Sequence, residues 1–391
     1  MKRVLPIIVI SQFFCTSLWF AGNAIIANIV EVFHIEPSFL AHITSAVQLG
    51  FITGTLVFAL FTIADRFSPS LVFFTASIIA ALCNLGILID GTGITGLLTF
   101  RFATGFFLAG IYPVGMKIAA DHFEHGLGRS LGFLVGALVL GTAFPHLLKT
   151  LTVSMPWKYV VYGTSALSVV GGIAMLIWVP DGPYRKSITK LKFTAFLSGF
   201  RSASFRSAAF GYFGHMWELY AFWAFVPVML GTYVSLHPSV QLNVPFLSFL
   251  IIGCGSIACA TSGSLSAFLG AKRIARFCLI VSGICCLLSP LVFLHAPVYL
   301  LLVFLFVWGL FVIADSPMFS TLVAQNAPAE TRGTSLTIIN CIGFAITIVS
   351  IQLVRYLSDQ TNAHFIYMLL AIGPLLGTVA LFSKNRSAEN K

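Results

Sequence analysis

Long apolar runs are the feature that most restricts what this chain can fold into. Of its 391 residues, 58% are hydrophobic and only 9% are charged. A water-soluble domain carries about a quarter charged residues. So few charges cannot cover a water-facing surface, and the sequence therefore predicts an integral membrane protein whose main partner is the lipid bilayer.

The runs predict an all-α polytopic membrane protein with twelve transmembrane helices, because a spanning helix takes roughly 17–25 apolar residues. Their approximate bounds are 4–30, 39–62, 71–90, 95–118, 129–148, 159–180, 207–230, 245–268, 274–294, 298–322, 333–354 and 364–383. The first run can also be read as a signal peptide. It continues to about Val30 without a small-residue cleavage pattern, which favours a first helix.

The basic residues fit a membrane topology better than a nucleic-acid surface. The net charge is +10. With the N-terminus placed inside, most lysines and arginines fall in predicted cytoplasmic segments, as the positive-inside rule requires. The basic residues outside those segments are Arg101, Lys149, Lys158 and Arg355. The sequence therefore predicts cytoplasmic N- and C-termini and no nucleic-acid partner.

The two halves of the chain follow the same six-helix pattern, and the polar interval 181–201 separates them. Four pairs of matching residues lie 203 or 204 positions apart, which indicates an internal repeat. The pairs are Gly105 and Gly309, Pro113 and Pro317, Trp19 and Trp223, and Arg129 and Arg332. We therefore predict two pseudo-symmetric six-helix bundles, 1–180 and 207–391, joined by a basic cytoplasmic linker, 181–206.

Two predicted turns and one segment of the predicted fourth helix resemble motifs of a known protein family. Twelve helices in two halves, with related turns after the second and eighth helices, resemble the major facilitator superfamily and its G-x-L-x-D-R-x-G-R-R-like turn. "RFATG", 101–105, resembles the arginine motif of the family's fourth helix. Each turn departs from the pattern, since Phe61 and Ala267 replace a glycine and an aspartate. The turn positions that keep the pattern are Asp65, Arg66, Gly263, Gly270 and Arg273.

The resemblance implies a transporter in which helices 1, 4, 7 and 10 line a central cavity and two bundles rock around it. It also implies that the retained turn residues act as a conformational gate. "GHMWELYAFW", 214–223, is similar to a stretch in bacterial members. On this basis we expect a monomer in a cell membrane, the bacterial inner membrane in particular.

Ionisable residues inside the predicted helices are the first functional candidates. A charge at the centre of a span costs at least about 2.5–3.5 kcal/mol, so such residues face a cavity or a partner. His215 and Glu218 lie three residues apart on one helical face. Burial favours the neutral carboxyl, which can then exchange protons near neutral pH. We predict Glu218 as the proton-coupling carboxyl, His215 as its relay, and Asp315 as the second candidate.

Other roles for these groups remain open at this point. Glu218 can instead pair with Arg101, hydrogen-bond a neighbour across the bundle, or contact the substrate directly. Arg101 can bind an anionic substrate as a bidentate fork or stabilise its own helix. Aromatic residues on the predicted cavity helices can stack on a flat or cationic substrate or simply pack. The substrate-binding candidates are Arg101, Trp19, Asn23, Tyr112, Tyr220, Trp223 and Gln12.

Several other chemistries find no support in the sequence. "DHFEH", 121–125, holds metal-type ligands, but its spacing matches no standard site. All eight cysteines lie in predicted helices, which argues against a disulfide framework. There is no Walker-type loop for ATP and no nucleophile motif. We therefore expect no metal, no cofactor and no enzymatic activity.

The sequence favours a secondary active transporter that moves a small organic solute by alternating access, coupled to protons. Uptake of an organic anion through Arg101 and efflux of a lipophilic cation in exchange for protons both remain open. A non-transporting sensor with the transporter fold is the alternative from another class. Substrate, direction, symport or antiport, and proton number are not fixed by the residues.

Overall fold

The computed structural model describes residues 4–123, 127–152, 155–185, 197, 199–328, 332–358, 360 and 365–382. Across those residues the regular structure is helical and contains no strand. Residues 186–196 and 198 of the predicted linker, the last two residues of the "DHFEH" segment, and both ends of the chain lie outside the described residues.

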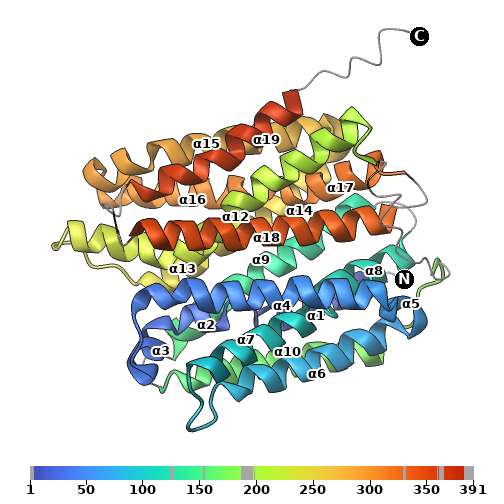
Figure 1. Cartoon of the computed structure of the whole chain (residues 1–391), viewed down its shortest axis with the longest axis horizontal. Coiled ribbons are helices and arrows are strands. Elements are labelled where there is room, and N and C mark those ends of the chain that lie inside the picture. Colours follow the sequence, from blue (N-terminus) through green and yellow to red (C-terminus); the bar gives the residue numbers. More distant parts are fainter. Residues whose placement is uncertain are drawn as a thin grey trace.

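The first part of the chain supplies the helices drawn in blue to green in Figure 1. These are α1 (Val4–Thr16), α2 (Ala21–Ala24), α3 (Ile26–Phe33), η1 (Pro37–Phe39), α4 (Leu40–Leu60), α5 (Ile63–Arg66), α6 (Pro69–Gly86), α7 (Ile94–Leu108), α8 (Tyr112–His122), α9 (Leu127–Leu151) and α10 (Lys158–Trp178).

The second part supplies the helices drawn in green-yellow to red. These are α12 (Ala203–Leu236), α13 (Val244–Gly253), α14 (Gly255–Leu269), α15 (Ala271–His295), α16 (Val298–Ala314), α17 (Ser316–Asn326), α18 (Arg332–Ser358), η3 (Ile366–Ala371) and α19 (Ile372–Phe382).

Ten helical segments in the described part of the chain are long and apolar enough to cross a membrane. Each coincides with one of the predicted runs, with both ends agreeing to within six residues. The first and last predicted runs differ, because they contain only the shorter apolar helices Val4–Thr16 and Ile366–Phe382. The prediction of a many-helix membrane protein is therefore confirmed at the level of ten candidate spans.

Breaks interrupt several of the long helices. One separates α1 from α2 at residues 17–20, and another separates α7 from α8 just before Pro113. A third falls at Asp315, between α16 and α17, two residues before Pro317. A proline lacks the N–H that would continue the helix and clashes with the preceding turn, which explains the second and third breaks.

Glycines let several helices approach each other backbone to backbone. A Cβ added to Gly50 or Gly105 would meet the carbonyl of Phe102 or Val47, at the contact between α4 and α7. Small residues at helix contacts are a common means of close packing in membranes.

A similar contact joins two helices from different parts of the chain. On α9, the Cβ positions of Gly132 and Gly136 face the backbone oxygens of Cys259 and Ser256 of α14. At these two glycines the main chains of α9 and α14 approach each other closely.

Figure 1 shows α1–α10 gathered on one side and α12–α19 on the other, with their axes roughly aligned. The largest contacts between the groups are those of α4 with α18 and of α9 with α13 and α14. Side chains buried at this junction form the candidate site.

The tight contact between α4 and α7 makes a testable prediction. Gly105→Ala places a methyl group against the carbonyl of Val47, and overpacking of this kind costs about 1–3 kcal/mol. We expect a lower melting temperature for the purified protein. Gly231→Ala is the matched control, because nothing lies within 4 Å of its Cβ position and alanine is about 1 kcal/mol better than glycine within a helix. Equal melting temperatures for the two variants would contradict this account.

Candidate functional site

Six buried aromatic rings meet where the two groups of helices join, and we call them the central aromatic cluster. The near-parallel rings of Trp19 and Phe344 have centroids 5.7 Å apart, and those of Phe51 and Phe344 are 4.5 Å apart. Tyr220 and Trp223 lie 5.1 Å apart in an edge-on arrangement. The cluster consists of Trp19, Phe20, Phe51, Tyr220, Trp223 and Phe344.

The cluster gathers residues that are far apart in sequence. Trp19 and Phe20 come from the break between α1 and α2, Phe51 from α4, Tyr220 and Trp223 from α12, and Phe344 from α18. The sequence candidates Trp19, Tyr220 and Trp223 are therefore brought together, as their predicted positions on helices 1 and 7 implied.

Buried polar atoms without a hydrogen-bond partner among the described residues occur on the same helices. The indole N–H groups of Trp19 and Trp223 have none, and neither amide atom of Gln12 or Gln48 has one. Gln48 lies one turn before Phe51 on α4. Because buried polar groups are nearly always hydrogen-bonded, such a set is a strong indication of a ligand or water site.

The polar candidates Asn23, Tyr112 and Gln12 have different surroundings from one another. Asn23 donates from its amide to the hydroxyl of Thr44 at 2.9 Å, so part of its side chain is already engaged. Tyr112 begins α8 and is buried. The amide oxygen of Gln12 packs against Gly115, also on α8, which has no side chain to displace it.

His215 pairs with Asp315 and not with Glu218. Nδ1 of His215 lies 2.8 Å from Oδ1 of Asp315, and both side chains are 1% exposed. Asp315 occupies the break between α16 and α17, where its carbonyl accepts from the N–H of Phe319. The rings of Tyr212 and Phe319 flank the imidazole at 6.0 and 5.6 Å.

Glu218 is held by three donors from two other helices. Oε1 accepts from Nε1 of Trp308 at 2.6 Å and from the thiol of Cys286 at 3.2 Å. Oε2 accepts from the hydroxyl of Ser282 at 2.8 Å. Of the alternatives open from the sequence, hydrogen bonding across the bundle is therefore observed, and it joins α12 to α15 and α16.

Arg101 donates to the carbonyls that the break after α1 leaves free. Nη2 lies 3.1 Å from the oxygen of Leu18 and 2.6 Å from that of Trp19. Nη1 donates to Oδ1 of Asn84 at 3.1 Å, and the amide nitrogen of Asn84 donates to the hydroxyl of Ser165 at 2.9 Å. Unpaired carbonyls are costly away from water, so this guanidinium supports the break and joins α7 to α6 and α10.

Pairing of Arg101 with a carboxylate was a second expectation from the sequence. Over the described residues, the recorded ion pairs do not include it. Its two terminal nitrogens serve the protein's own oxygens, and Nε has no partner among the described residues.

The turn after α4 is fixed by charges. Lys117 on α8 lies 3.2 Å from Asp65 and 3.0 Å from Asp121. Arg185 donates to the carbonyls of Asp65 and Phe67, both at 2.8 Å. Lys117, Asp121 and Arg185 lie on other segments and therefore join the turn residues that the sequence predicted.

The remaining turn residues have simpler surroundings. Arg66 donates to the hydroxyl of Thr62 at 3.1 Å. Gly270 has φ 80°, a conformation that favours glycine, and separates α14 from α15. Gly263 lies against Gly132 of α9, and Arg273 is exposed.

Metal ligands do not gather in the part of the chain that the structure describes, where no three His, Cys, Asp or Glu side chains lie close enough to hold an ion. Nδ1 of His122 lies 2.8 Å from the carbonyl of Ile118. Glu124 and His125 of the "DHFEH" segment lie outside the described residues.

Sequence reasoning missed several residues of this region. Asn84 and Gln48 are amides within apolar runs, and this isolation was a usable signal for both. Trp308, which donates to Glu218, gave no such signal because tryptophan is common in membrane helices.

Comparison with known proteins gives a family and a fold. The profile of the Major Facilitator Superfamily matches residues 8–351. The crystal structure of the human organic anion transporter MFSD10 (TETRAN) superimposes with a TM-score of 0.77 at 14% identity, over 97% of this chain and 99% of that one. At this identity the likeness concerns the fold alone. No curated protein sequence matches.

The hydrogen bonds of Arg101 lead to a second prediction. In Arg101→Lys the charge remains, but a single ammonium on a flexible stem cannot reach Asn84 and both carbonyls together. Each lost bond costs about 1–3 kcal/mol, so we expect a melting temperature several degrees lower. Arg201→Lys, at an exposed position, is the control and should melt like the parent protein. An unchanged melting temperature for Arg101→Lys would remove the structural role assigned to it.

Proposed function

The chain belongs to the Major Facilitator Superfamily, and from this premise we propose that it is a secondary active transporter working by alternating access. The family makes it a multi-pass membrane transporter of a small molecule and not an enzyme. The proposal adds the mechanism, the class of solute and the coupling ion.

The proposed architecture has twelve helices in two bundles. The ten candidate spans are completed by the helices of residues 4–33 at one end and by η3 with α19 at the other. Bundles 1–180 and 207–391, joined by the linker 181–206, would meet along α4 with α18 and α9 with α13 and α14. The excess of basic residues in alternate loops supports cytoplasmic termini. We propose the bacterial inner membrane as the location and the monomer as the working unit.

The proposed gate lies at the cytoplasmic end of this arrangement. The charged group around Asp65 and Lys117 ties the turn after α4 to α8. The second turn, with Gly263, Gly270 and Arg273, has no comparable set of ion pairs among the described residues. We propose that the first turn holds its bundle rigid while the glycine-containing turn lets α14 and α15 adjust.

The solute is proposed to be a flat organic molecule with hydrogen-bond acceptors. The single observation that carries this proposal is the central aromatic cluster with its unpaired N–H groups. An indole N–H only donates, so Trp19 and Trp223 require an acceptor, while the ring faces suit a flat partner. Tyr220, Gln12 and Gln48 complete the proposed contacts, and Asn23 and Tyr112 remain further candidates.

A lipophilic organic cation exchanged for protons is the second candidate. The terminal nitrogens of Arg101 are occupied by the protein's own oxygens, which leaves only Nε to attract an anion. The buried carboxyls of Asp315 and Glu218 and the aromatic faces would favour a cation. MFSD10 is an organic anion transporter by its title, and this makes aromatic anions the natural competing probes.

Proton coupling is proposed to reside in the pair of His215 and Asp315. With one proton between them the pair has no net charge, and a second proton leaves a net positive charge in an apolar interior. That cost favours opening the site to water, and Asp315 lies at a helix break where such a change can be accommodated. Glu218, fixed by three donors, is the second candidate and the better one for a structural role.

Binding by the central aromatic cluster is tested with four probes: benzoate, salicylate, tetraphenylphosphonium and ethidium. We expect at least one to raise the melting temperature of the purified protein at pH 5.5 or pH 8 by mass action. Trp223→Phe removes one donor and should weaken that binding about fivefold. Because it also shortens a fully buried ring, the ligand-induced shift is measured from the variant's own, lower ligand-free melting temperature. Trp178→Phe, at an exposed tryptophan, is the control. Undiminished binding by Trp223→Phe would place the solute elsewhere.

Coupling is tested in proteoliposomes with the probe that binds. With an imposed pH gradient, Asp315→Asn should lose uphill accumulation but keep binding and downhill exchange, because an amide cannot exchange protons. Glu218→Gln should be less stable yet still coupled, and Asp90→Asn, at an exposed position, should behave like the parent protein. Full accumulation by Asp315→Asn would refute the assignment, and binding without any transport would favour the sensor.

A further inference from the structure

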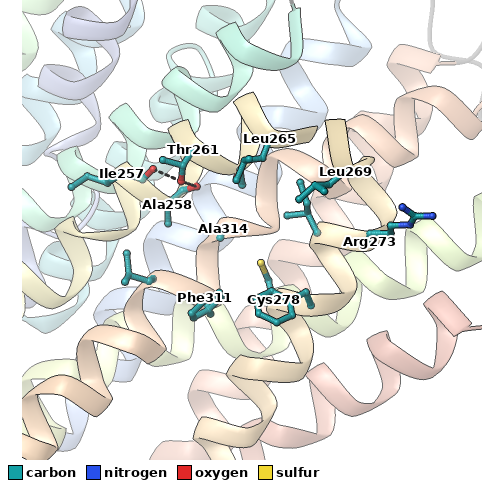
Figure 2. Close-up of a pocket in the computed structure, with 13 residues that line it drawn as sticks. Ile257, Ala258, Thr261, Leu265, Leu269, Arg273, Cys278, Phe311 and Ala314 are labelled. Carbon is teal, nitrogen blue, oxygen red and sulfur yellow. Dashed lines mark hydrogen bonds between the residues drawn. The ribbon is translucent and has the colours of Figure 1, made fainter. Parts of the chain in front are cut away.

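A groove lies between α14, α15 and α16, away from the central aromatic cluster, and has a cavity volume of about 490 Å³. Figure 2 shows the side chains that line it. Its lining is almost entirely carbon. The apolar walls include Ile257, Ala258, Leu265, Phe277, Leu310 and Phe311.

The few polar side chains inside the groove are already engaged. The hydroxyl of Thr261 donates to the carbonyls of Ile257 and Ala258 on its own helix, and that of Ser262 donates to Cys259. Figure 2 shows the Thr261 bond as a dashed line. A polar solute would find nothing to bond with there, whereas a hydrocarbon chain loses nothing on entering.

One end of the groove carries a positive charge. Arg273 is exposed and lies at that end in Figure 2, with its guanidinium directed away from the apolar walls. None of the recorded ion pairs among the described residues involves it. Lys272 adjoins it, and Arg276, one turn further, donates to the carbonyl of Leu381 and lies 4.1 Å from the ring of Phe382.

We propose that this groove is a binding site for an anionic phospholipid, with one acyl chain along α14 and α16 and the phosphate at Arg273. A volume of 490 Å³ accommodates on the order of fifteen methylenes, if each takes about the 30 Å³ of a water molecule. An arginine suits a phosphate because its fork can donate two parallel bonds. The proposal does not depend on transport, so either can fail without the other.

The headgroup, and not the chain, must provide the selectivity. Bilayer tails are as apolar as the groove walls, so moving a chain between them gives little preference. A basic residue at the membrane surface attracts anionic lipid by a factor of about five. Arg273 therefore predicts that an anionic lipid is preferred over a zwitterionic one with identical chains.

Native mass spectrometry of the full chain, equilibrated with equal amounts of dioleoyl phosphatidylglycerol and dioleoyl phosphatidylcholine, tests the headgroup. We expect bound phosphatidylglycerol to exceed phosphatidylcholine about fivefold, and Arg273→Gln to bring the two towards equality. Arg201→Gln removes an exposed arginine outside the groove and should keep the preference. Equal binding of both lipids by the parent protein, or a preference that survives Arg273→Gln, would overturn the proposal.

The groove itself is tested with phosphatidylglycerol that carries a photoreactive diazirine in one acyl chain. We expect its crosslinks to map to α14, α15 and α16 and to fall sharply in Thr261→Phe, which fills the groove from an exposed position. Ser264→Phe, exposed on the same helix but outside the lining, should leave them unchanged. Equal loss in both variants, or a second copy of the chain occupying the groove, would refute the lipid assignment.

Discussion

A lipid bilayer supplies no hydrogen-bond partners, and this constraint decides where the buried polar residues of the chain lie. Where α1 ends, the carbonyls of Leu18 and Trp19 lose their helical partners, and Arg101 donates to both. The carboxyl oxygens of Glu218 need hydrogen-bond donors in the same apolar surroundings, and side chains of α15 and α16 supply them. One buried charge in each part of the chain thus binds three or more helices into a unit.

The buried polar atoms divide into those that the protein satisfies and those that it leaves unpaired. Asn84, Glu218 and the two terminal nitrogens of Arg101 belong to the first group, and their bonds explain why polar and ionisable groups are tolerated inside apolar helices. Trp19 and Trp223 belong to the second, with unpaired N–H groups next to stacked rings. Hydrogen bonding therefore separates the residues that support the helices from those that we propose to bind a ligand, although both groups are equally buried.

The sequence predicted the spans well because hydrophobic length is a local property of the chain. It did not predict the partners of His215 and Arg101, since Asp315 and Asn84 lie on other helices. Which side chains meet depends on how each helix is rotated about its axis, and an apolar helix gives little periodic signal for that rotation. The break after α1 was also unforeseen, because no proline lies at residues 17–24 to mark it.

The glycine contact between α9 and α14 has a consequence for motion. Gly132 and Gly136 present no side chain of their own to the backbone of the facing helix. A change in the crossing angle of the two helices at these positions requires no rotamer change of the glycines, because glycine has no side chain. In the proposed cycle this contact would set the direction of movement, and the ion pairs at the helix ends, Lys117 with Asp65 among them, would set its rate.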